Sequence, residues 1–231
     1  MGQSARQTGI ASRPKESALR AARAVYGRIE RSPAAPMLRA RVVQQTRRRL
    51  QRRMQATEVL EVLDGLKASG LEVCVAGGWG VDALLGTQTR QHEDLDLIVD
   101  LAREGDAQAA LQALGFRRIR AEFFPGALMP KQIIMRDRAG RIVDLHGVDP
   151  HTWPGSWRER LDRAGRSAVP FDPAKPFAVG TIEGRRIECL SPELQLASRQ
   201  GYELPDSAAT DARALCARFH LAEPRYLQTV T

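Results

Sequence analysis

The chain of 231 residues has no apolar run of 18 residues, so we expect no membrane-spanning helix. Its first residues lack the apolar stretch that a secretory signal requires, so none is expected. Cysteine is scarce: Cys74, Cys189 and Cys216 lie far apart and are odd in number. This argues against a disulfide framework or a zinc site and favours buried or free thiols. We therefore expect a cytoplasmic protein with no membrane partner.

Charge is distributed unevenly along the chain. Residues 1–56 contain 14 arginines and lysines but only two acids, Glu16 and Glu30, which gives this segment a net charge of +12. The remaining residues contain 21 basic and 25 acidic side chains and carry a net charge of −4. The chain is best described as a basic arm joined to a mildly acidic globular part, large enough to bury a core.

The basic arm suggests three segments: residues 1–54 as a helical extension, 55–150 as a core, and 151–231 as a C-terminal part. Helices are expected near 16–31 and from about residue 37 through the Arg47-Arg48-Arg49 cluster. Clustered arginines are typical of nucleic-acid contacts but also of solvated helix faces. Apolar positions in the arm favour packing on the core or a homodimer contact over nucleic-acid binding.

Beyond the arm, the pattern alternates between helices and strands. A helix with Val59, Val62, Leu63 and Leu66 on one face should end at Gly70. After Pro150 the chain is rich in proline and is expected to be loop. The other expected elements are strand 73–76, a turn at Gly77-Gly78, helix 79–85, strand 95–99, helix 103–114, strands 131–136 and 141–146, a hairpin of 178–182 with 185–189, a helix from Ser191-Pro192-Glu193, and helix 206–220.

The most informative stretch joins this glycine turn to two aspartates. Asp94 and Asp96 are two residues apart in an apolar run, and this spacing places both side chains on one face of a strand. Adjacent carboxylates suit a hard cation such as Mg²⁺. Gly77 and Gly78 leave backbone N–H groups open to a phosphate. A metal beside a phosphate cradle indicates nucleotide chemistry.

A third carboxylate lies in another apolar stretch. Asp144 and His146 share one face of the expected strand 141–146. Three carboxylates on adjacent strands would hold one or two Mg²⁺ ions against a triphosphate. An aspartate at a strand end can also merely cap a turn, and His146 can face the cleft or simply end its strand.

These residues resemble the signature of the nucleotidyltransferase superfamily. The similarity is greatest to the aminoglycoside 2″-adenylyltransferase and lincosamide nucleotidyltransferase branch. It covers residues 57–150 well, extends weakly into 190–202, and leaves 1–54 unmatched. The matching positions are Gly77-Gly78-Trp79, Asp82, Leu85-Gly86, Thr89-Arg90 and His92-Glu93-Asp94-Leu95-Asp96-Leu97.

The resemblance implies an α+β, polymerase-beta-like fold with a small mixed sheet and a helical C-terminal part. It implies that Asp94 and Asp96 hold Mg²⁺ bound to ATP, and that Asp144 completes the metal site and acts as general base. Gly77 and Gly78 would contact the triphosphate. Many relatives have serine after the glycine pair, whereas this chain resembles the 2″-type enzymes in having tryptophan there, so backbone donors would bind more of the phosphate.

Further site candidates have structural alternatives. Arg90 would lie near the phosphates or be solvated, and His92 would bind phosphate or brace the adjoining turn. Arg199 could clamp the triphosphate or form a surface salt link. Trp153 and Trp157, four residues apart, could form an aromatic wall for base or acceptor, or pack in a core or interface.

Together these features predict a Mg²⁺-dependent enzyme that transfers AMP from ATP to a hydroxyl of a small molecule. The resemblance suggests an aminoglycoside or lincosamide antibiotic as acceptor. One alternative is a toxin-like nucleotidyltransferase that modifies a tRNA or a protein, which the basic arm would favour. The other is a non-catalytic module that binds through the arm, although the retained carboxylates argue against it.

Overall fold

The computed structural model describes residues 52–123, 127–163, 169–200 and 204–228. These residues belong to one compact unit, Gln51–Thr231. The two helices expected before residue 50 and the contacts expected of the basic arm lie outside the described ranges, as do Gly201 and Tyr202. Within these ranges, no helix is both long and apolar enough to cross a membrane.

The described chain alternates between strands and helices, with longer helices towards the C-terminus. The strands are β1 (Cys74–Val75), β2 (Leu95–Asp100), β3 (Arg117–Phe123), β4 (Lys131–Arg136), β5 (Ile142–Val148), β6 (Phe177–Ile182) and β7 (Arg185–Leu190). The helices are α3 (Ala56–Ala68), α4 (Gly77–Leu85), the 3-10 turn η1 (Leu101–Arg103), α5 (Glu104–Ala113), α6 (Gly155–Arg163), α7 (Pro192–Ala197), α8 (Asp206–Phe219) and α9 (Arg225–Gln228).

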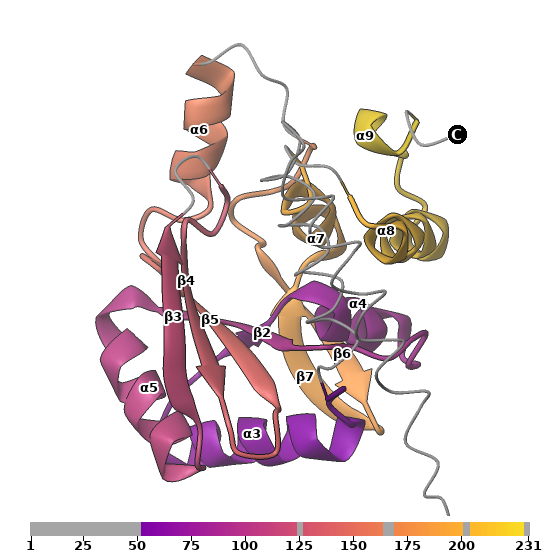
Figure 1. Cartoon of the computed structure of the whole chain (residues 1–231). Helices are drawn as coiled ribbons and strands as arrows, with labels where there is room; N and C mark the ends of the chain where they lie inside the picture. Colours follow the sequence, from indigo (N-terminus) through magenta and orange to yellow (C-terminus); the bar gives the residue numbers. More distant parts are fainter. Residues whose placement is uncertain (1–51, 124–126, 164–168, 201–203, 229–231) are drawn as a thin grey trace, which may run out of the picture. The chain divides into compact units, whose positions relative to one another are not determined.

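The strands form one mixed sheet in the order β3-β4-β5-β2-β1-β7-β6 (Figure 1). Strand β2 is parallel to β5, and β1 is parallel to β7. The other neighbours are antiparallel. The hairpin of β6 and β7, which follows residue 150, extends the same sheet beside β1. The mixed sheet and its helices agree with the expected α+β class.

The core fixes the register of the central strands. Every residue of β5 is buried, and Leu95 and Leu97 of β2 are fully enclosed. Helix α3 buries the apolar face that its sequence predicts, and α3 contacts α5 (Figure 1). Because side chains alternate along a strand, a slip of one residue would expose this apolar set. The packing therefore also fixes which side chains of β2 and β5 face the opposite side of the sheet.

Helix α4 lies beside β6 and contacts α7 and α8 (Figure 1). Gly180 of β6 permits this packing, because a Cβ there would overlap the backbone of Ala83. Helix α7 begins as its sequence predicts, since the Ser191 hydroxyl accepts a hydrogen bond from the Leu194 N–H at 3.2 Å. These contacts bring the C-terminal helices next to the start of α4.

Three local expectations are wrong. Strand β3 was not expected because four of its seven residues are charged, although Ile119, Ala121 and Phe123 alternate with the charged residues. Helix α6 lies in a stretch expected to be loop; its proline, Pro154, precedes the first helical residue, where proline breaks no helical hydrogen bond. The glycine pair is the first turn of α4 and not a separate turn, since the Ala76 carbonyl already accepts from the Gly80 N–H at 3.0 Å.

Candidate active site

Two of the predicted carboxylates lie opposite each other on neighbouring strands. Asp96 of β2 is the register partner of Asp144 of β5, and the two strands run parallel through the centre of the sheet. Asp94 immediately precedes β2 and is half-buried. Period-two alternation therefore places the pair Asp96 and Asp144 on one face, as the sequence predicts.

Asp144 is buried in a polar setting. Its side chain accepts a hydrogen bond from the Gln132 amide on β4, while its Oδ1 has no hydrogen-bond partner among the described residues. Burial, followed by the nearby charges of Asp96 and Asp94, raises the pKa of Asp144 to about 8, against the lowering effect of Gln132. The carboxyl group thus has a proton affinity near neutral pH and one uncommitted oxygen.

His146 joins the same face of the sheet. Its Nε2 lies 3.3 Å from Asp96 Oδ1, and its Nδ1 lies 3.2 Å from the Lys131 carbonyl oxygen. The imidazole is buried and therefore held between β4 and β2. Of the two interpretations of His146, the structure favours the one in which it faces the carboxylates.

The glycine pair lies against this carboxylate face. Gly77 has a φ of +60°, and a Cβ at this position would overlap the carboxylate of Asp96. A Cβ at Gly78 would overlap Nδ1 of His92. Only glycine allows the start of α4 to approach both side chains, so the N-terminus of this helix is open beside Asp96.

His92 is enclosed beneath the start of α4. Its Nε2 pairs with the carboxylate of Asp82, which also accepts hydrogen bonds from the N–H (3.1 Å) and hydroxyl (2.6 Å) of Thr89. The Nδ1 of His92 is buried and has no partner in the part of the chain that the structure describes. The pair with Asp82 agrees with the interpretation that His92 braces the adjoining turn, and its buried Nδ1 faces Gly78.

Arg90 and Arg199 both approach Asp211 of α8. Arg90 makes two hydrogen bonds to its carboxylate, at 3.0 and 2.7 Å, and Arg199 Nη2 lies 3.9 Å from the same group. Burial opposes the charge on Arg90, but the hydrogen bonds and charge of Asp211 outweigh it and raise the guanidinium pKa. Arg199 is itself buried, so it is not the surface salt link considered above.

The two tryptophans belong to one second apolar cluster, in which Trp157 is buried and Trp153 packs against it, and they contact different aromatic rings. Trp153 stacks with Phe177 at a centroid distance of 6.0 Å, and Trp157 lies 5.9 Å from Phe171 within this cluster. The core alternative is therefore correct for Trp157. The three cysteines are free and buried, as expected.

A preassembled metal cage is not present. In the described ranges, no three His, Cys, Asp or Glu side chains are arranged as a ready-made metal site. Asp96 and Asp144 nevertheless present facing carboxylates, and the unpartnered Oδ1 of Asp144 is the kind of hard oxygen donor that Mg²⁺ prefers. These residues fit a divalent cation, with Asp94 close enough to influence the charge of Asp144.

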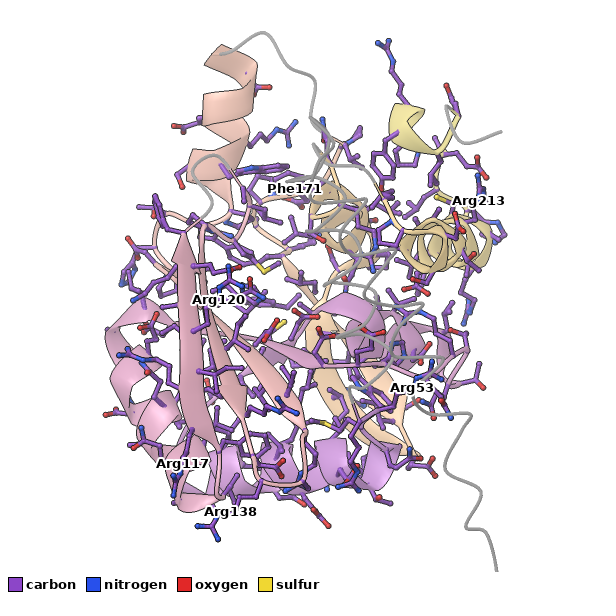
Figure 2. The ribbon with its side chains drawn as sticks, in the orientation of Figure 1. Arg53, Arg117, Arg120, Arg138, Phe171 and Arg213 are labelled. Atoms are coloured by element: carbon purple, nitrogen blue, oxygen red, sulfur yellow. The ribbon has the colours of Figure 1, made fainter. Side chains whose placement is uncertain are left out.

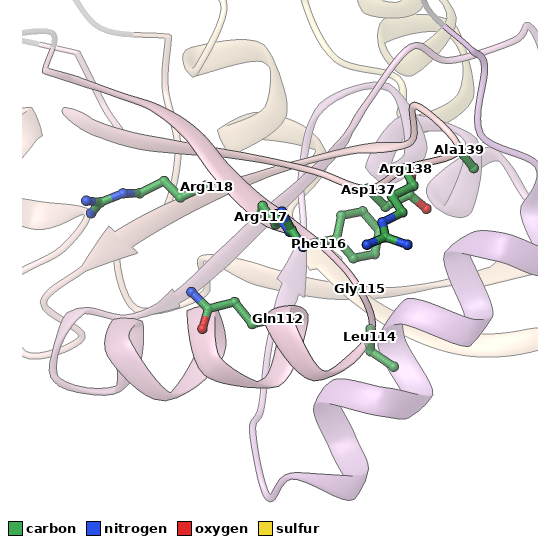
Figure 3. Close-up of a pocket in the computed structure, with 9 residues that line it drawn as sticks. All are labelled: Gln112, Leu114, Gly115, Phe116, Arg117, Arg118, Asp137, Arg138 and Ala139. Atoms are coloured by element: carbon green, nitrogen blue, oxygen red, sulfur yellow. The ribbon is translucent and has the colours of Figure 1, made fainter.

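A hollow of about 770 Å³ lies apart from these residues, where α5 meets β3 and the turn between β4 and β5 (Figure 3). Arg117 and Arg138 lie near one end of β3, as Figure 2 shows. None of the predicted site residues lines this hollow. Its lining comprises Gln112, Leu114, Gly115, Phe116, Arg117, Arg118, Asp137, Arg138 and Ala139.

Three supporting residues were missed by the sequence analysis. Asp82 belongs to the motif but was given no role, although its place one helical turn after Gly78 was a usable signal. Gln132 shares a strand face with Ile134, the register partner of Asp144. Asp211 lies 121 residues from Arg90, so no local pattern could connect them.

Comparison with known proteins agrees with this geometry. A family model described as aminoglycoside-2″-adenylyltransferase matches residues 58–215, which is most of the chain and includes every predicted site residue. The chain belongs to the aminoglycoside-2″-adenylyltransferase family. It is therefore a nucleotidyltransferase. The matched residues include the strands that carry the carboxylates, helix α7 and most of helix α8.

Individual members of this family extend the comparison. The chain is 36% identical over 137 residues to a 2″-aminoglycoside nucleotidyltransferase of Klebsiella pneumoniae, covering 59% of this chain and 68% of that protein. It is 26% identical over 158 residues to a lincosamide resistance protein of Staphylococcus haemolyticus, covering 68% and 92%. Both relatives are curated proteins named for antibiotics.

Solved structures show the same fold. A lincomycin-bound lincosamide antibiotic adenylyltransferase, LnuA, has a TM-score of 0.53 at 23% identity, covering 71% of this chain and 98% of its own. ANT(2″)-Ia in complex with adenylyl-2″-tobramycin has a TM-score of 0.52 at 21% identity, covering 71% and 89%.

Proposed function

We propose that this nucleotidyltransferase transfers AMP from ATP to a hydroxyl of a small antibiotic of the aminoglycoside or lincosamide type, in a Mg²⁺-dependent reaction. The observation that carries the proposal is the facing pair Asp96 and Asp144 beside the glycine-lined start of α4. Carboxylates that suit a cation lie next to a helix N-terminus that suits phosphate. The names of the two relatives support the antibiotic acceptor.

Asp94, Asp96 and Asp144 would hold the metal. Bound Mg²⁺ supplies charge neutralisation for the triphosphate oxygens and for the leaving pyrophosphate. The start of α4 at Gly77 and Gly78 orients the triphosphate through backbone N–H groups and the positive end of the helix dipole. Arg90 lies close to Gly78, so its guanidinium adds positive charge at the same place.

Asp144 is the residue best suited to accept a proton from the acceptor hydroxyl. In the proposed step, the hydroxyl oxygen forms a bond to the α-phosphorus as its proton moves to a carboxylate oxygen of Asp144. The bond from that phosphorus to the bridging oxygen breaks, and pyrophosphate leaves. Gln132 orients the carboxylate through its hydrogen bond, and Oδ1 has no hydrogen-bond partner among the described residues.

The net charge of the chain beyond residue 56 is −4, which favours a cationic acceptor such as an aminoglycoside. The family includes relatives named for both antibiotic classes, so the acceptor is a question for direct assay. We also propose that the protein acts in the cytoplasm, because its three free thiols suit a reducing compartment that supplies ATP.

A pyrophosphate-release assay with Mg²⁺ and ATP tests the proposal against aminoglycosides, lincosamides and tRNA. We expect release with at least one antibiotic and transfer of labelled AMP to it. Asp96→Asn should lower turnover at least about 100-fold, because it removes charge that the metal needs while keeping the side-chain shape. Asp106→Asn, a matched change on the exposed face of α5, should retain it.

Asp144→Asn separates two roles of this residue. If Asp144 is the base, kcat should fall by about 10²- to 10⁴-fold with a smaller change in the ATP Kd. Equal losses in both would mean that it mainly holds the metal. Transfer of AMP only to tRNA or to a protein would replace the antibiotic proposal with the macromolecular acceptor.

A further inference from the structure

Two arginines that the sequence analysis singled out converge on one buried carboxylate. The side chain of Asp211 on α8 is only 2% exposed. Arg90 Nε and Nη2 donate to its two oxygens at 3.0 and 2.7 Å, a bidentate arrangement. Arg199 of the segment after α7 lies 3.9 Å from the same carboxylate. A buried carboxylate is costly without such partners, so these three residues form one electrostatic unit.

The two arginines differ in what remains available to a ligand. The side chain of Arg199 is 6% exposed, and its Nη1 donates to the backbone carbonyl and the side-chain oxygen of Gln195, at 2.6 and 3.1 Å. Arg90 is 32% exposed. Arg199 is therefore committed to the protein interior, whereas Arg90 is partly exposed, with its Nη1 donating to the Gln91 carbonyl oxygen at 3.3 Å.

The guanidinium of Arg90 lies against the start of α4. Its Nη2 is 2.9 Å from the position that a Cβ of Gly78 would take, in the crowded space that only a glycine leaves to these side chains. The unpartnered Nδ1 of His92 borders the same space. A guanidinium, an uncommitted imidazole nitrogen and the N-terminus of a nine-residue helix thus meet at one glycine. The guanidinium and the helix N-terminus each favour an anion.

We propose that Asp211 and Arg199 are positioning residues that hold the Arg90 guanidinium over Gly78, where it binds a phosphate group of the nucleotide. Helix α8 then contributes to the nucleotide site through Asp211, in addition to packing against α4. This inference rests on the proposed function, because it names the residues that support the phosphate-binding cation of that site.

The test is a double-mutant cycle on ATP binding. Titration of the full-length chain with ATP and Mg²⁺, without acceptor, gives the Kd, and steady-state assays give kcat. Asp211→Asn should raise the Kd about tenfold, because the untethered guanidinium samples other rotamers, with kcat at saturating ATP changed less than about threefold. Arg90→Ala should raise the Kd at least as much.

The cycle distinguishes positioning from folding. In an Arg90→Ala background, adding Asp211→Asn should leave the Kd nearly unchanged, since the cation that Asp211 positions is already gone. Asp206→Asn, the same change on the exposed first turn of α8, is the matched control and should retain the wild-type Kd. If Asp211→Asn fails to fold, Arg199→Lys serves as the second variant. It keeps the positive charge and should also raise the ATP Kd.

Additive effects of Asp211→Asn in both backgrounds, or a wild-type Kd in folded Asp211→Asn or Arg199→Lys, would overturn the inference. Failure of the proposed function is a separate result: the wild-type chain would then transfer AMP to no antibiotic while ATP binding still reports on Arg90. Absence of ATP binding in the wild-type chain would overturn both.

Discussion

The carboxyl group of Asp144 lies where several influences on its ionisation meet. Burial and two neighbouring aspartates favour the protonated form, and the Gln132 amide favours the charged form. The result is a pKa of about 8, far above that of an aspartate in water. Such a group can exchange a proton near neutral pH, which is the property that a general base requires.

This shift predicts how the stability of the metal-free protein depends on pH. The folded chain retains a proton that the unfolded Asp144, with an ordinary pKa of 3.8, has lost. The raised pKa of Asp144 therefore contributes fully to the free energy of unfolding below pH 3.8. This contribution is lost as the pH rises through about 8. In EDTA, the Tm of the wild-type chain should fall more between about pH 5 and pH 9 than that of Asp144→Asn.

Added Mg²⁺ gives the complementary measurement. A cation competes with the proton for the same oxygens, so Mg²⁺ should raise the wild-type Tm more at the alkaline end of this range than at the acidic end. Parallel Tm curves for the wild type and Asp144→Asn in EDTA would mean that Asp144 titrates like an exposed carboxyl group.

At the scale of elements, α4 joins the phosphate cradle to the rest of the fold. Its first residues approach Asp96 and His92, and its remaining length packs against β6 and α8. The helix can make these contacts because glycines at both its start and its neighbouring strand remove the side chains that would intervene. Function and packing therefore depend on the same small residues.

Replacing Gly78 with alanine tests this arrangement. The added methyl group would overlap His92 Nδ1 and press on Arg90 Nη2, so we expect a loss of about 1–3 kcal/mol in the free energy of unfolding. ATP binding should weaken as well, since the methyl group fills the cradle. Urea unfolding and ATP titration measure the two effects.

Gly105→Ala in α5 is the control, because no atom lies within 4 Å of a Cβ at that position. Alanine is the better helix former, so this variant should gain about 0.5–1 kcal/mol and bind ATP normally. Wild-type stability and ATP affinity in Gly78→Ala would show that the cradle is roomier than the structure indicates.

At the scale of the whole molecule, an isolated antiparallel bridge connects the N-terminal end of the described chain to the site. Met54 is fully buried, and its N–H donates to the carbonyl oxygen of His92 at 3.2 Å. The side chain of Arg53 pairs with Gln91 on the same loop. The chain just before α3 thus braces the segment that carries His92, and a truncation experiment must respect this boundary.

We predict that deleting residues 1–51 lowers the Tm but retains AMP transfer to a small acceptor, whereas deleting 1–55 also impairs transfer because Met54 no longer braces His92. Apolar residues in the arm favour packing or a dimer contact, which sedimentation would detect. Filter binding to RNA at low and high salt tests the other role of the arm. Tight, salt-sensitive binding that is lost with residues 1–51 would favour a macromolecular acceptor.

Those parts of the site that depend on local spacing could be predicted from the sequence. Asp94, Asp96, Gly77 and Gly78 lie within 20 residues of one another, and alternation along a strand is enough to predict that Asp96 faces the cradle. The same holds for the capped start of α7. Strand β3 was missed although Ile119, Ala121 and Phe123 alternate with charged residues, because four of its seven residues are charged and its apolar residues stay exposed.

Which distant groups meet depends on how the chain packs in three dimensions. The register of β5 against β2 placed Asp144 opposite Asp96, and the surrounding core then raised its pKa. The packing of α8 on α4 brought Asp211 to Arg90 across 121 residues. Both outcomes depend on burial and on Coulomb interactions. These are set by distances in space and not by separation along the chain.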